Sequence, residues 1–376
     1  MKVIHICLVS KQATPNLVPL MDSSMQVDEV ILTHTRPFNE HAQWLANALK
    51  IYGKKTRLLE LPSSDNLALL REFFIALYQQ EYQLGATQLI CNLSGGTKPM
   101  SLALYEMALM TEADGTEAYY MNLNDTLSWY IPKNRPTQAL DDLIKLPAFL
   151  TAHGWSPCQK PQGSKYPQLR PLVETLATQI RKFTPALSQL NALASSARSN
   201  QQVSTPIQNC GTALNDLITL LVEFNLVERQ GDAIEFLSED ARFFCNGGWL
   251  EELVFHTIKQ LSAKNKKIQD FALGLEIQSN SNGIQNELDN AVLVDNKLII
   301  IECKTAKTRG NTLLRDSLYK LDTLTKIGGT TGRGLLISLH PITPHDQERA
   351  QEYHIDLIHG MQIEALPQHL HKILSR

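Results

Sequence analysis

The sequence lacks a long apolar run, a strong net charge and any metal-like cysteine spacing. None of its apolar stretches is long enough to cross a membrane, so we expect no membrane partner. A net charge of −3 argues against a protein that coats nucleic acid through bulk electrostatics, so any nucleic-acid contact must be local. The six cysteines contain no C-x-x-C pair, which argues against a zinc site and favours reduced thiols in the cytoplasm.

The N-terminus is not expected to be a signal peptide. The apolar run from Val3 to Val9 is short, contains His5 and leads into polar residues, which is typical of a first strand. Local contact with nucleic acid has one candidate, a basic neighbourhood made of Lys264, Lys266, Lys267, Lys304, Lys307 and Arg309. Clusters of this kind are more often solvated surface than binding sites.

The first 150 residues alternate strand-like and helix-like patterns. Strands are expected at Lys2–Val9, Glu29–Thr33, Arg57–Leu61 and Gln88–Leu93, and a strand pair at Glu117–Met121 and Leu127–Ile131. Helices are expected at Asn39–Ile51 and Asn66–Tyr82, where apolar residues recur at three- and four-residue spacing. The alternation predicts an α/β domain at 1–150, with a Rossmann-like parallel sheet and helices on both faces.

Ligands of such sheets bind beyond the carboxyl ends of the strands, where two loops carry suitable residues. The first loop contains Ser10 and Lys11, and the second contains Ser94, Gly95, Gly96, Thr97 and Lys98. The glycines let backbone N–H groups approach a ligand, the threonine can cap the following helix, and Lys98 adds positive charge. These residues predict an anion-binding site for phosphate or ribose. A plain glycine turn with a helix cap is the alternative.

A chain of 376 residues is too long for one typical core, and its middle part predicts a helical domain at 160–240. Residues 154–168 have the glycine and proline content of a linker. Helices are expected at Arg170–Lys182, Ala186–Ala197 and Thr212–Phe224, before a short hairpin over 226–237. This order resembles a winged helix. The last of the three helices has no Lys or Arg, which favours a spacer or dimerisation module over nucleic-acid contact.

A hydrophobic hairpin in the C-terminal part carries the strongest chemical signal. Two apolar strand-like runs flank the turn Asp295–Asn296; Asp289 opens the first strand, and Glu302 and Lys304 close the second. Residues two apart on a strand point to the same face, so Glu302 and Lys304 project together while Cys303 faces the other way. Strand pairing can bring Asp289 beside them. Two carboxylates and an ammonium then converge at one end of the hairpin.

This arrangement suits a phosphodiesterase that uses a hard divalent cation. Mg²⁺ or Mn²⁺ held by carboxylate oxygens stabilises charge on the phosphate and supplies a nucleophilic water. We expect Asp289 and Glu302 to be metal ligands, with a third carboxylate from Glu251, preferred to Glu252, at the start of an upstream helix. Lys304 would orient the water or neutralise charge on the phosphate. The alternative is a surface hairpin that ends in an ordinary Glu–Lys pair.

The remainder of the segment 241–376 predicts a mixed α/β domain. A strand is expected at Ala272–Gln278, a helix at Asn311–Ile327, a strand at Gly334–Ser338 and a helix at Pro344–Tyr353. Tyr319 and Lys320 on the first of these helices are expected to face the site. The glycine-rich segment Gly328–Arg333 either tracks a phosphate backbone or is a flexible turn.

Both ends of the chain resemble known families. Asp289, Glu302 and Lys304 resemble the PD-(D/E)XK nuclease motif, with Glu251 in the place of that superfamily's first-helix acid and Leu288 where a proline is usual. Residues up to about 140 resemble the CRISPR-associated Rossmann fold, or CARF, sensor of cyclic oligoadenylates, through the Asn-x-Ser-Gly-Gly-Thr-Lys loop and the Ser10 loop. The resemblance implies a restriction-endonuclease-like fold for the C-terminal domain.

The same resemblance implies a type III CRISPR ancillary effector nuclease of antiviral defence, activated by a cyclic oligoadenylate such as cyclic tetraadenylate. It further implies a homodimer that shares one messenger pocket, and Mn²⁺- or Mg²⁺-dependent cleavage of single-stranded RNA, DNA or both. Two alternatives stay open. A ligand-responsive DNA-binding regulator would use the winged-helix-like part and keep an inactive nuclease domain, although the complete Asp–Glu–Lys set argues against it. A stand-alone restriction or repair nuclease would bind another nucleotide through its first domain.

Overall fold

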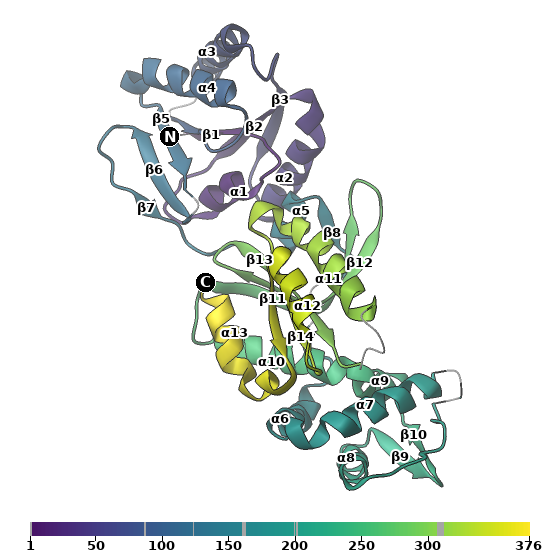
Figure 1. The fold of residues 1–376 in the computed structure, drawn as a ribbon. Helices are drawn as coiled ribbons and strands as arrows, with labels where there is room; N and C mark the ends of the chain where they lie inside the picture. Colours follow the sequence, from purple (N-terminus) through teal and green to yellow (C-terminus); the bar gives the residue numbers. More distant parts are fainter. Residues whose placement is uncertain are drawn as a thin grey trace.

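A computed structural model describes residues 2–85, 88–122, 124–159, 163–198, 200, 202–306 and 312–376. Three parts follow one another along an elongated molecule (Figure 1). The N-terminal sheet with its helices lies at one end, a second sheet lies in the middle, and a mainly helical part lies at the other end. Within the described ranges, no helix combines the length and apolar character needed to cross a bilayer.

In the N-terminal sheet the strands lie in the order β3-β2-β1-β4-β5-β6-β7. They are β1 (Val3–Leu8), β2 (Glu29–His34), β3 (Thr56–Glu60), β4 (Gln88–Asn92), β5 (Glu117–Met121), β6 (Thr126–Ile131) and β7 (Gln138–Ala139). Strands β1 to β5 are parallel, whereas β6 and β7 run antiparallel to their neighbours. The Rossmann-like parallel sheet expected from the sequence is therefore confirmed.

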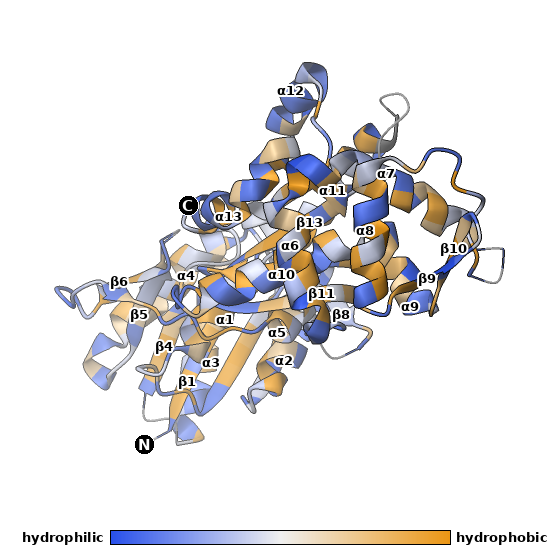
Figure 2. Ribbon diagram, turned by 90° about the horizontal axis from the view of Figure 1, so that it is seen from below, coloured by the Kyte–Doolittle hydropathy of each residue, from blue (hydrophilic) through white to orange (hydrophobic). Residues whose placement is uncertain are grey.

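Helices cover both faces of this sheet. α1 (Thr14–Met21) and α2 (Asn39–Ile51) pack on one face, and α3 (Leu67–Gln83) and α4 (Lys98–Met110) pack on the other. Strand β1 is buried on both faces, as is usual in parallel sheets, and Figure 2 shows it mostly orange. Cys7 and Cys91 are buried free thiols on strands β1 and β4.

Helix α1 is missing from the expected elements because its sequence contains Pro15 and Pro19. Pro15 lies in the first turn, where a helix leaves the N–H unpaired in any case. Pro19 cannot donate to the carbonyl of Pro15, but the side-chain amide of Asn92 donates to that oxygen at 2.9 Å. Strand β4 thus supplies the hydrogen bond that the proline removes.

The second sheet has the strand order β15-β14-β13-β12-β11-β8. Its strands are β8 (Trp155–Pro157), β11 (Ile268–Ser279), β12 (Gln285–Val294), β13 (Lys297–Lys304), β14 (Arg333–Ser338) and β15 (Ile355–His359). β12 and β13 form the expected hairpin, which Asp295 and Asn296 turn with φ of 51° and 55°. Both residues are left-handed, as a tight two-residue turn between twisted strands requires.

Helices cover the second sheet on both faces as well. α10 (Trp249–Ser262) and α13 (Leu366–Leu374) pack on one face, and α11 (Thr312–Thr325) and α12 (Pro344–Glu352) pack on the other. Strands β13, β14 and β15 are parallel, and β11 and β12 are antiparallel to their partners. The mixed α/β domain is confirmed. Asn311, the first residue of an expected helix, lies outside the described residues.

The helical part is built around a small antiparallel hairpin. Its elements are α6 (Arg170–Thr178), α7 (Ile180–Ala197), α8 (Thr212–Glu223), β9 (Val227–Gln230), β10 (Ala233–Phe236) and α9 (Glu239–Phe243). β9 and β10 pair with each other, which confirms the winged-helix-like order. The break between the first two helices falls at Gln179 rather than at 183–185, and Pro185 lies inside α7.

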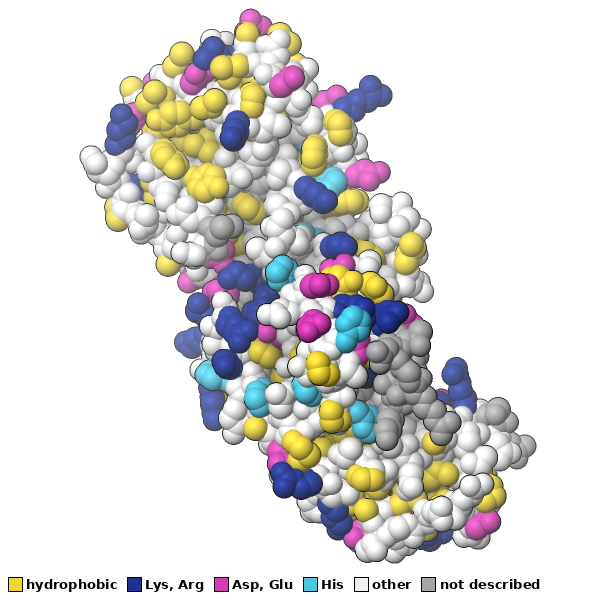
Figure 3. Space-filling view, viewed as in Figure 1, with side chains coloured by type: hydrophobic (Ala, Val, Ile, Leu, Met, Phe, Trp, Pro, Cys, Tyr) yellow, Lys and Arg dark blue, Asp and Glu magenta, His cyan; other side chains and the backbone are white. Residues whose placement is uncertain are grey.

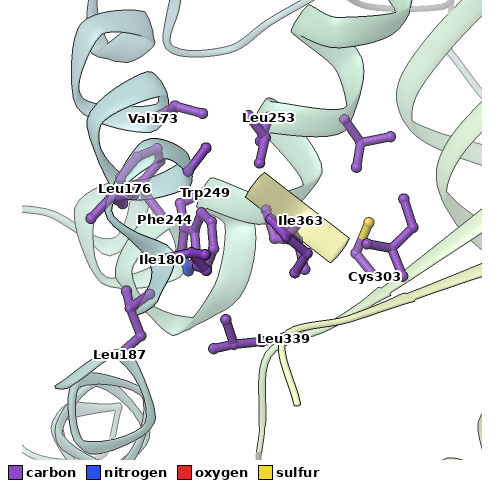
Figure 4. Packing of buried hydrophobic residues seen from close by; sticks show 14 of the residues in the cluster. Val173, Leu176, Ile180, Leu187, Phe244, Trp249, Leu253, Cys303, Leu339 and Ile363 are labelled. Carbon is purple, nitrogen blue, oxygen red and sulfur yellow. The ribbon is translucent and has the colours of Figure 1, made fainter. Parts of the chain in front are cut away.

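Continuous hydrophobic clusters join the three parts. One cluster unites α6, α7 and α8 with α10, α13 and one face of β13 (Figure 4). Its members include Val173, Leu176, Ile180, Trp249, Leu253 and Cys303. A second cluster runs from the α1 and α2 face of the N-terminal sheet through α5 (Leu146–Ala152) to the α11 face of the second sheet. A third cluster lies between the N-terminal sheet and α3 and α4.

The linker expected at 154–168 is wrong for its first residues. Trp155–Pro157 forms β8, which pairs antiparallel with β11 at the edge of the second sheet. Gly154 before it has a φ of 82°, and a Cβ there would lie 2.8 Å from the ring of Trp44 on α2. The glycine and proline content therefore marks a packed connection. Residues 160–162 of this segment lie outside the described residues.

Candidate functional site

Three of the predicted catalytic side chains meet at one end of the β12–β13 hairpin. The backbone N–H of Cys303 donates a hydrogen bond to Asp289 Oδ2 at 2.7 Å, which fixes the Asp289 carboxylate beside β13. Lys304 Nζ lies 2.5 Å from Glu302 Oε1. Cys303 points to the other face and is buried in the cluster of Figure 4, as the alternation along a strand requires. The expected convergence is present.

Helix α11 adds a second cation to this group. Lys320 Nζ lies 3.1 Å from Glu302 Oε2, so two ammonium groups hold a carboxylate that is only 2% exposed. This contact confirms the expectation that Lys320 faces the site. Tyr319 is 47% exposed, and its ring lies 5.7 Å from that of Tyr353, centroid to centroid.

Glu251 approaches the same acids from α10, which packs on the other face of the sheet. Burial, followed by the charge of Asp289, raises the pKa of Glu251 to about 8. The neighbouring Glu252 has a different role, because its carboxylate accepts a hydrogen bond from the backbone of Lys165 at 3.0 Å and lies 3.5 Å from His256. The geometry therefore favours Glu251 over Glu252, as the sequence did.

The acids at this end repel one another. Burial, followed by the charge of Glu302, raises the pKa of Asp289 to about 6. For Lys304, burial lowers the pKa, but the charges of Glu302 and Asp289 outweigh burial and the net shift is upward. Crowded acids with raised pKa values are typical of functional sites. Carboxylate oxygens are also the donors that a hard divalent cation prefers, so the residue types fit Mg²⁺ or Mn²⁺.

A different acidic group has ligand atoms within 4.8 Å of one another in the described ranges: Asp125, Asp142 and Asp295. It lies at the turn end of the hairpin and joins the two sheets. The side-chain amide of Asn296 donates to Asp125 at 3.1 Å and to Asp142 at 3.0 Å. Lys267 and Lys297 pair with Asp295 at 3.0 and 3.2 Å. Burial, followed by the charge of Asp295, still raises the pKa of Asp142 to about 6, so these partners offset only part of the repulsion. The hydrogen bonds of Asn296 nevertheless connect the hairpin to the sensor, and we read the group as a tie between domains.

The basic neighbourhood expected from the sequence does not form one surface. Lys267 pairs with Asp295 at the turn end, whereas Lys304 lies seven residues along β13 from Lys297, about 23 Å away at the rise of a strand. Lys307 and Arg309 lie outside the described residues. The supposed cluster therefore spans both ends of the sheet.

The glycine-rich segment also lies at the turn end. Lys326–Thr331 forms a 3₁₀ turn, and a Cβ on Gly328 would lie 3.2 Å from Leu298 at the start of β13. Glu302 lies near the opposite end of the same strand, so this segment is not beside the catalytic acids, and its contact with a phosphate backbone stays a prediction.

The second predicted site is built on the loop between β4 and α4. A Cβ on Gly95 would lie 1.9 Å from the carbonyl oxygen of Leu8, so this glycine is needed for packing against β1. Its approach to a ligand stays a prediction. Gly96 has a φ of 71°. Thr97 caps α4, as predicted, with its hydroxyl 3.5 Å from the N–H of Met100. The Ser94 hydroxyl accepts a hydrogen bond from the backbone of β5.

Two cavities open on either side of this loop, and Gly96 lines both. One, of about 470 Å³, is lined by Ser10, Gly96 and Thr97 together with Thr35, Arg36, Ser63 and Ser64. The other, of about 650 Å³, is lined by Ser94, Gly95, Gly96 and Lys98 together with Tyr105, Tyr120 and Tyr130. Hydroxyls, a helix N-terminus, an ammonium and aromatic rings suit an anionic ligand with bases.

The predicted binding residues divide between the two cavities, and further residues that were not predicted also line them. Lys11 is exposed and is not among the described residues that line either cavity. The loops after β2 and β3, which carry Arg36 and Ser64, were missed by sequence reasoning. The signal was available, because both loops follow parallel strands at their carboxyl ends.

Comparisons with known proteins agree with this architecture. Residues 4–146 match the family described as the Card1 CARF domain. Residues 238–375 match the family described as the Card1-like endonuclease domain. A search of curated proteins found no match.

Solved structures match the whole chain. Protein VC1899 from Vibrio cholerae is 28% identical with a TM-score of 0.89, over 99% of this chain and 98% of that one. Can2 from Sulfobacillus thermosulfidooxidans, in complex with cyclic tetra-adenylate, is 24% identical with a TM-score of 0.82 over 100% of both chains. A type III CRISPR defence DNA nuclease activated by cyclic oligoadenylate is 17% identical with a TM-score of 0.63, and this chain covers 52% of it. The last two likenesses support the fold alone.

Proposed function

We infer that this chain, which belongs to the Card1-like family through its CARF domain at residues 4–146 and its endonuclease domain at residues 238–375, is a nuclease activated by a cyclic oligoadenylate. The observation that carries the nuclease assignment is the meeting of Asp289, Glu302 and Lys304 at one end of the β12–β13 hairpin. The two domains together are those expected of an ancillary nuclease in type III CRISPR antiviral defence.

The proposed centre is a PD-(D/E)XK site that uses Mn²⁺ or Mg²⁺, with Asp289, Glu302 and Glu251 as ligands. Burial, followed by the charges of neighbouring acids, raises the pKa of Asp289 and of Glu251, and a cation would relieve the repulsion among these acids. When bound, such a cation stabilises charge on the phosphate and lowers the pKa of a water. Lys304 holds one oxygen of Glu302 and would neutralise charge on the phosphate, while the Cys303 N–H keeps Asp289 in place.

The proposed activator is cyclic tetraadenylate or a related ring, bound in the cavities around the Ser94–Lys98 loop. Lys98 and the N-terminus of α4 supply positive potential for phosphates, and the hydroxyls of Ser10 and Ser94 supply hydrogen bonds. The rings of Tyr120 and Tyr130 can stack on bases. Can2, which shares the fold over its whole length, was solved with cyclic tetra-adenylate.

The proposed assembly is a homodimer that covers an apolar patch on the sensor. The exposed members of this patch are Leu102, Leu109 and Met110 of α4, Tyr120 of β5 and Tyr130 of β6. Figure 3 shows hydrophobic side chains gathered on this face of the sensor. Contiguous apolar surface of this kind is typical of an interaction site. A second copy across a two-fold axis would place two Ser94–Lys98 loops around one ring.

The proposed substrate is single-stranded RNA, DNA or both. Tyr319 is exposed on the helix that carries Lys320, and an exposed aromatic ring can stack on an unpaired base. The fold is shared with a DNA nuclease of type III CRISPR defence, which supports DNA as one substrate. Free cysteines suit action in the reducing cytoplasm.

A cleavage assay tests this function. The purified protein is mixed with labelled single-stranded RNA or DNA and Mn²⁺ or Mg²⁺, with and without cyclic tetra-adenylate. We expect cleavage that needs both the metal and the messenger and that Glu302→Ala abolishes. Messenger binding with no cleavage of any substrate, together with tight binding to duplex DNA, would favour the ligand-responsive regulator. Cleavage that no cyclic oligoadenylate changes would favour a stand-alone nuclease.

A further inference from the structure

The sensor loop after β1 contacts the endonuclease domain directly. Gln12 Oε1 accepts a hydrogen bond from the backbone N–H of Thr330 at 3.2 Å. A Cβ on Gly329 would lie 2.4 Å from that oxygen, and Gly329 has a φ of 66°. The positive φ favours glycine at 329, and a larger residue there would push the Gln12 side chain aside. The glycine-rich segment is therefore shaped for contact with the sensor.

Gln12 is in turn tied to a residue that lines a sensor cavity. The Ser10 hydroxyl accepts a hydrogen bond from the Gln12 N–H and donates one to the Gln12 carbonyl, both at 3.3 Å. Ser10 lines the cavity of about 470 Å³ beside Gly96 and Thr97. A ligand group that hydrogen-bonds Ser10 competes with these local bonds, so occupation of the cavity displaces Gln12.

The segment that Gln12 contacts follows α11 directly, with a kink at Gly329 just before Thr330. The 3₁₀ turn Lys326–Thr331 starts directly after α11, which packs along β13 and β14. Leu318 and Leu321 on the buried face of α11 are fully enclosed. A close-packed helix moves as a unit, and Lys320 lies six residues before Lys326, or about 9 Å along the helix axis. A shift at Thr330 therefore reaches Lys320.

Lys320 is the point at which α11 meets the catalytic acids. Its Nζ lies 3.1 Å from Glu302 Oε2 and 3.4 Å from Oε1, while Lys304 takes Oε1 at 2.5 Å. An ammonium at these oxygens competes with a divalent cation for them, because the two positive charges repel at such distances. Removal of Lys320 from Glu302 makes the carboxylate a better metal ligand.

We propose that Gln12, the turn Lys326–Thr331 and Lys320 form the route by which the messenger controls metal binding at Glu302. The inference deepens the proposed function and rests on it. The Gln12–Thr330 bond holds α11 in the position that keeps Lys320 on Glu302. Ligand at Ser10 weakens this bond, and Lys320 leaves the carboxylate. Messenger and metal then favour the same arrangement, so each must raise the affinity of the protein for the other.

Calorimetry tests this coupling without relying on cleavage. Mn²⁺ binding is measured with and without cyclic tetra-adenylate in the wild type, in Gln12→Ala and in Lys320→Ala. Gln80→Ala, at an exposed position on α3, is the matched control. We expect the messenger to raise the Mn²⁺ affinity of the wild type and the control about tenfold or more. Gln12→Ala should bind Mn²⁺ more tightly than the wild type without messenger, because the bond that holds Lys320 on Glu302 is absent, and it should therefore lose most of this gain. Lys320→Ala should bind Mn²⁺ tightly without messenger.

Thr330→Pro provides a second, independent test, because it removes the N–H donor and leaves Gln12 intact. It should lose the gain as Gln12→Ala does, with thermal melts to confirm that each variant folds. If the messenger raised the Mn²⁺ affinity of Gln12→Ala and Thr330→Pro as much as that of the wild type, the proposed route would be wrong. The same would follow if Lys320→Ala bound Mn²⁺ as weakly as the messenger-free wild type. Wild-type cleavage that the messenger does not stimulate would reject the proposed function and the route with it. Normal stimulation with unchanged coupling would reject the route alone.

Discussion

Acids gather at both ends of the β12–β13 hairpin. At the turn end, called here the paired end, Asn296 bridges two of them, whereas at the other, crowded end Glu251 and Asp289 lie close to Glu302. Asn296 donates to two carboxylates of the sensor and exchanges two hydrogen bonds with Gln269, at 2.7 and 2.8 Å. At the far end, Glu251 and Asp289 have raised pKa values because burial and neighbouring charge oppose their ionisation. Burial and the charge of Asp295 also raise the pKa of Asp142 to about 6, so acids repel one another at both ends. At the turn end the hydrogen bonds of Asn296 tie the sensor to the hairpin, and at the far end a bound cation would relieve the repulsion.

One hairpin can both attach the sensor and carry the proposed catalytic acids, because these two roles fall at its opposite ends. The two ends lie about 23 Å apart at the rise of a strand, so the sensor can be attached firmly without occupying the catalytic end. Buried polar networks with every group paired tend to rigidify a structure. Sites with unbalanced charge tend to cost stability and to carry function. Substitutions at the two ends should therefore have opposite effects on stability and activity.

The largest expected effect is on activity at the crowded end. Glu302→Ala should reduce cleavage by more than about a hundredfold, because even outer-sphere partners of a metal are worth about 10- to 100-fold. Its thermal melt and its affinity for the messenger should stay close to those of the wild type. The test is cleavage of labelled RNA and DNA with Mn²⁺ and messenger. Wild-type cleavage by this variant would contradict the assignment.

Lys304→Ala separates charge from metal binding at the same end. It should also be inactive, since its ammonium would no longer neutralise charge on the phosphate, but it should still bind Mn²⁺. Calorimetry with Mn²⁺ distinguishes the two variants. Loss of metal binding in Lys304→Ala would show that the lysine supports the carboxylates rather than the phosphate.

The next largest effect should follow from reversing the charge at the sensor loop. Lys98→Glu should weaken binding of cyclic tetra-adenylate by about 10- to 150-fold, the range for losing a charge-assisted hydrogen bond. Lys50→Glu on α2 is the matched control, at an exposed position away from both cavities. The measurement is calorimetry with each variant. Unchanged affinity in Lys98→Glu would place the messenger elsewhere.

A smaller effect, on stability rather than activity, is expected at the paired end. Asn296→Ala removes the side-chain hydrogen bonds that Asn296 forms with Gln269, Asp125 and Asp142. Each of these three side chains then loses a hydrogen-bond partner. We expect the free energy of unfolding to fall by about 2 kcal/mol, the cost of leaving buried polar groups unpaired. Urea denaturation measures it. If Asn296→Ala matched the wild type, the paired end would not stabilise the fold.

The smallest expected effect is a change in stability with pH, which arises from the acids at the crowded end. Asp289 and Glu251, with pKa values raised to about 6 and 8, bind protons more tightly in the folded chain than in the unfolded one. These groups therefore make the metal-free protein less stable as the pH rises from about 4 to 8. Mn²⁺ needs the charged carboxylates, so the rise in melting temperature that it causes should grow over the same range.

Glu251→Gln isolates this effect from the other titrating groups. The variant should melt higher than the wild type without metal at pH 8, and the difference should shrink toward pH 5. Its rise in melting temperature with Mn²⁺ should be smaller at every pH. A variant that melts lower than the wild type at pH 8 would show that Glu251 stabilises the fold, and that the two ends of the hairpin do not differ in the way described.

The catalytic end was predictable because its signals are local. A two-residue turn at Asp295–Asn296, alternation along β13 and an upstream acid were enough to bring Glu302, Lys304 and Asp289 together. Lys320 was also expected to face the site, and it contacts Glu302. Periodicity and turn chemistry act over short stretches of chain, so they specify such an arrangement well.

The paired end was not predictable, because its contacts join distant residues. The bond between Asn296 and Asp125 spans 171 positions, and the bond between Thr330 and Gln12 spans 318. No periodic pattern in the sequence predicts contacts between residues so far apart. The sequence around Asn296 predicts a turn, and it would do so whether or not the side chain had hydrogen-bond partners. Helix α1 was missed for a related reason, since the bond that compensates Pro19 comes from another strand.

Strand β8 makes the covalent connection between the two domains part of the endonuclease sheet. A fragment that began after Pro157 would leave the last three residues of β11 without their partner strand, and unpaired edge groups favour strand-to-strand association. The sheet thus needs residues that precede the expected domain boundary at 241. Exchange of one sensor for another on this endonuclease, by recombination in nature or by fusion in the laboratory, should succeed only when the junction falls before Trp155.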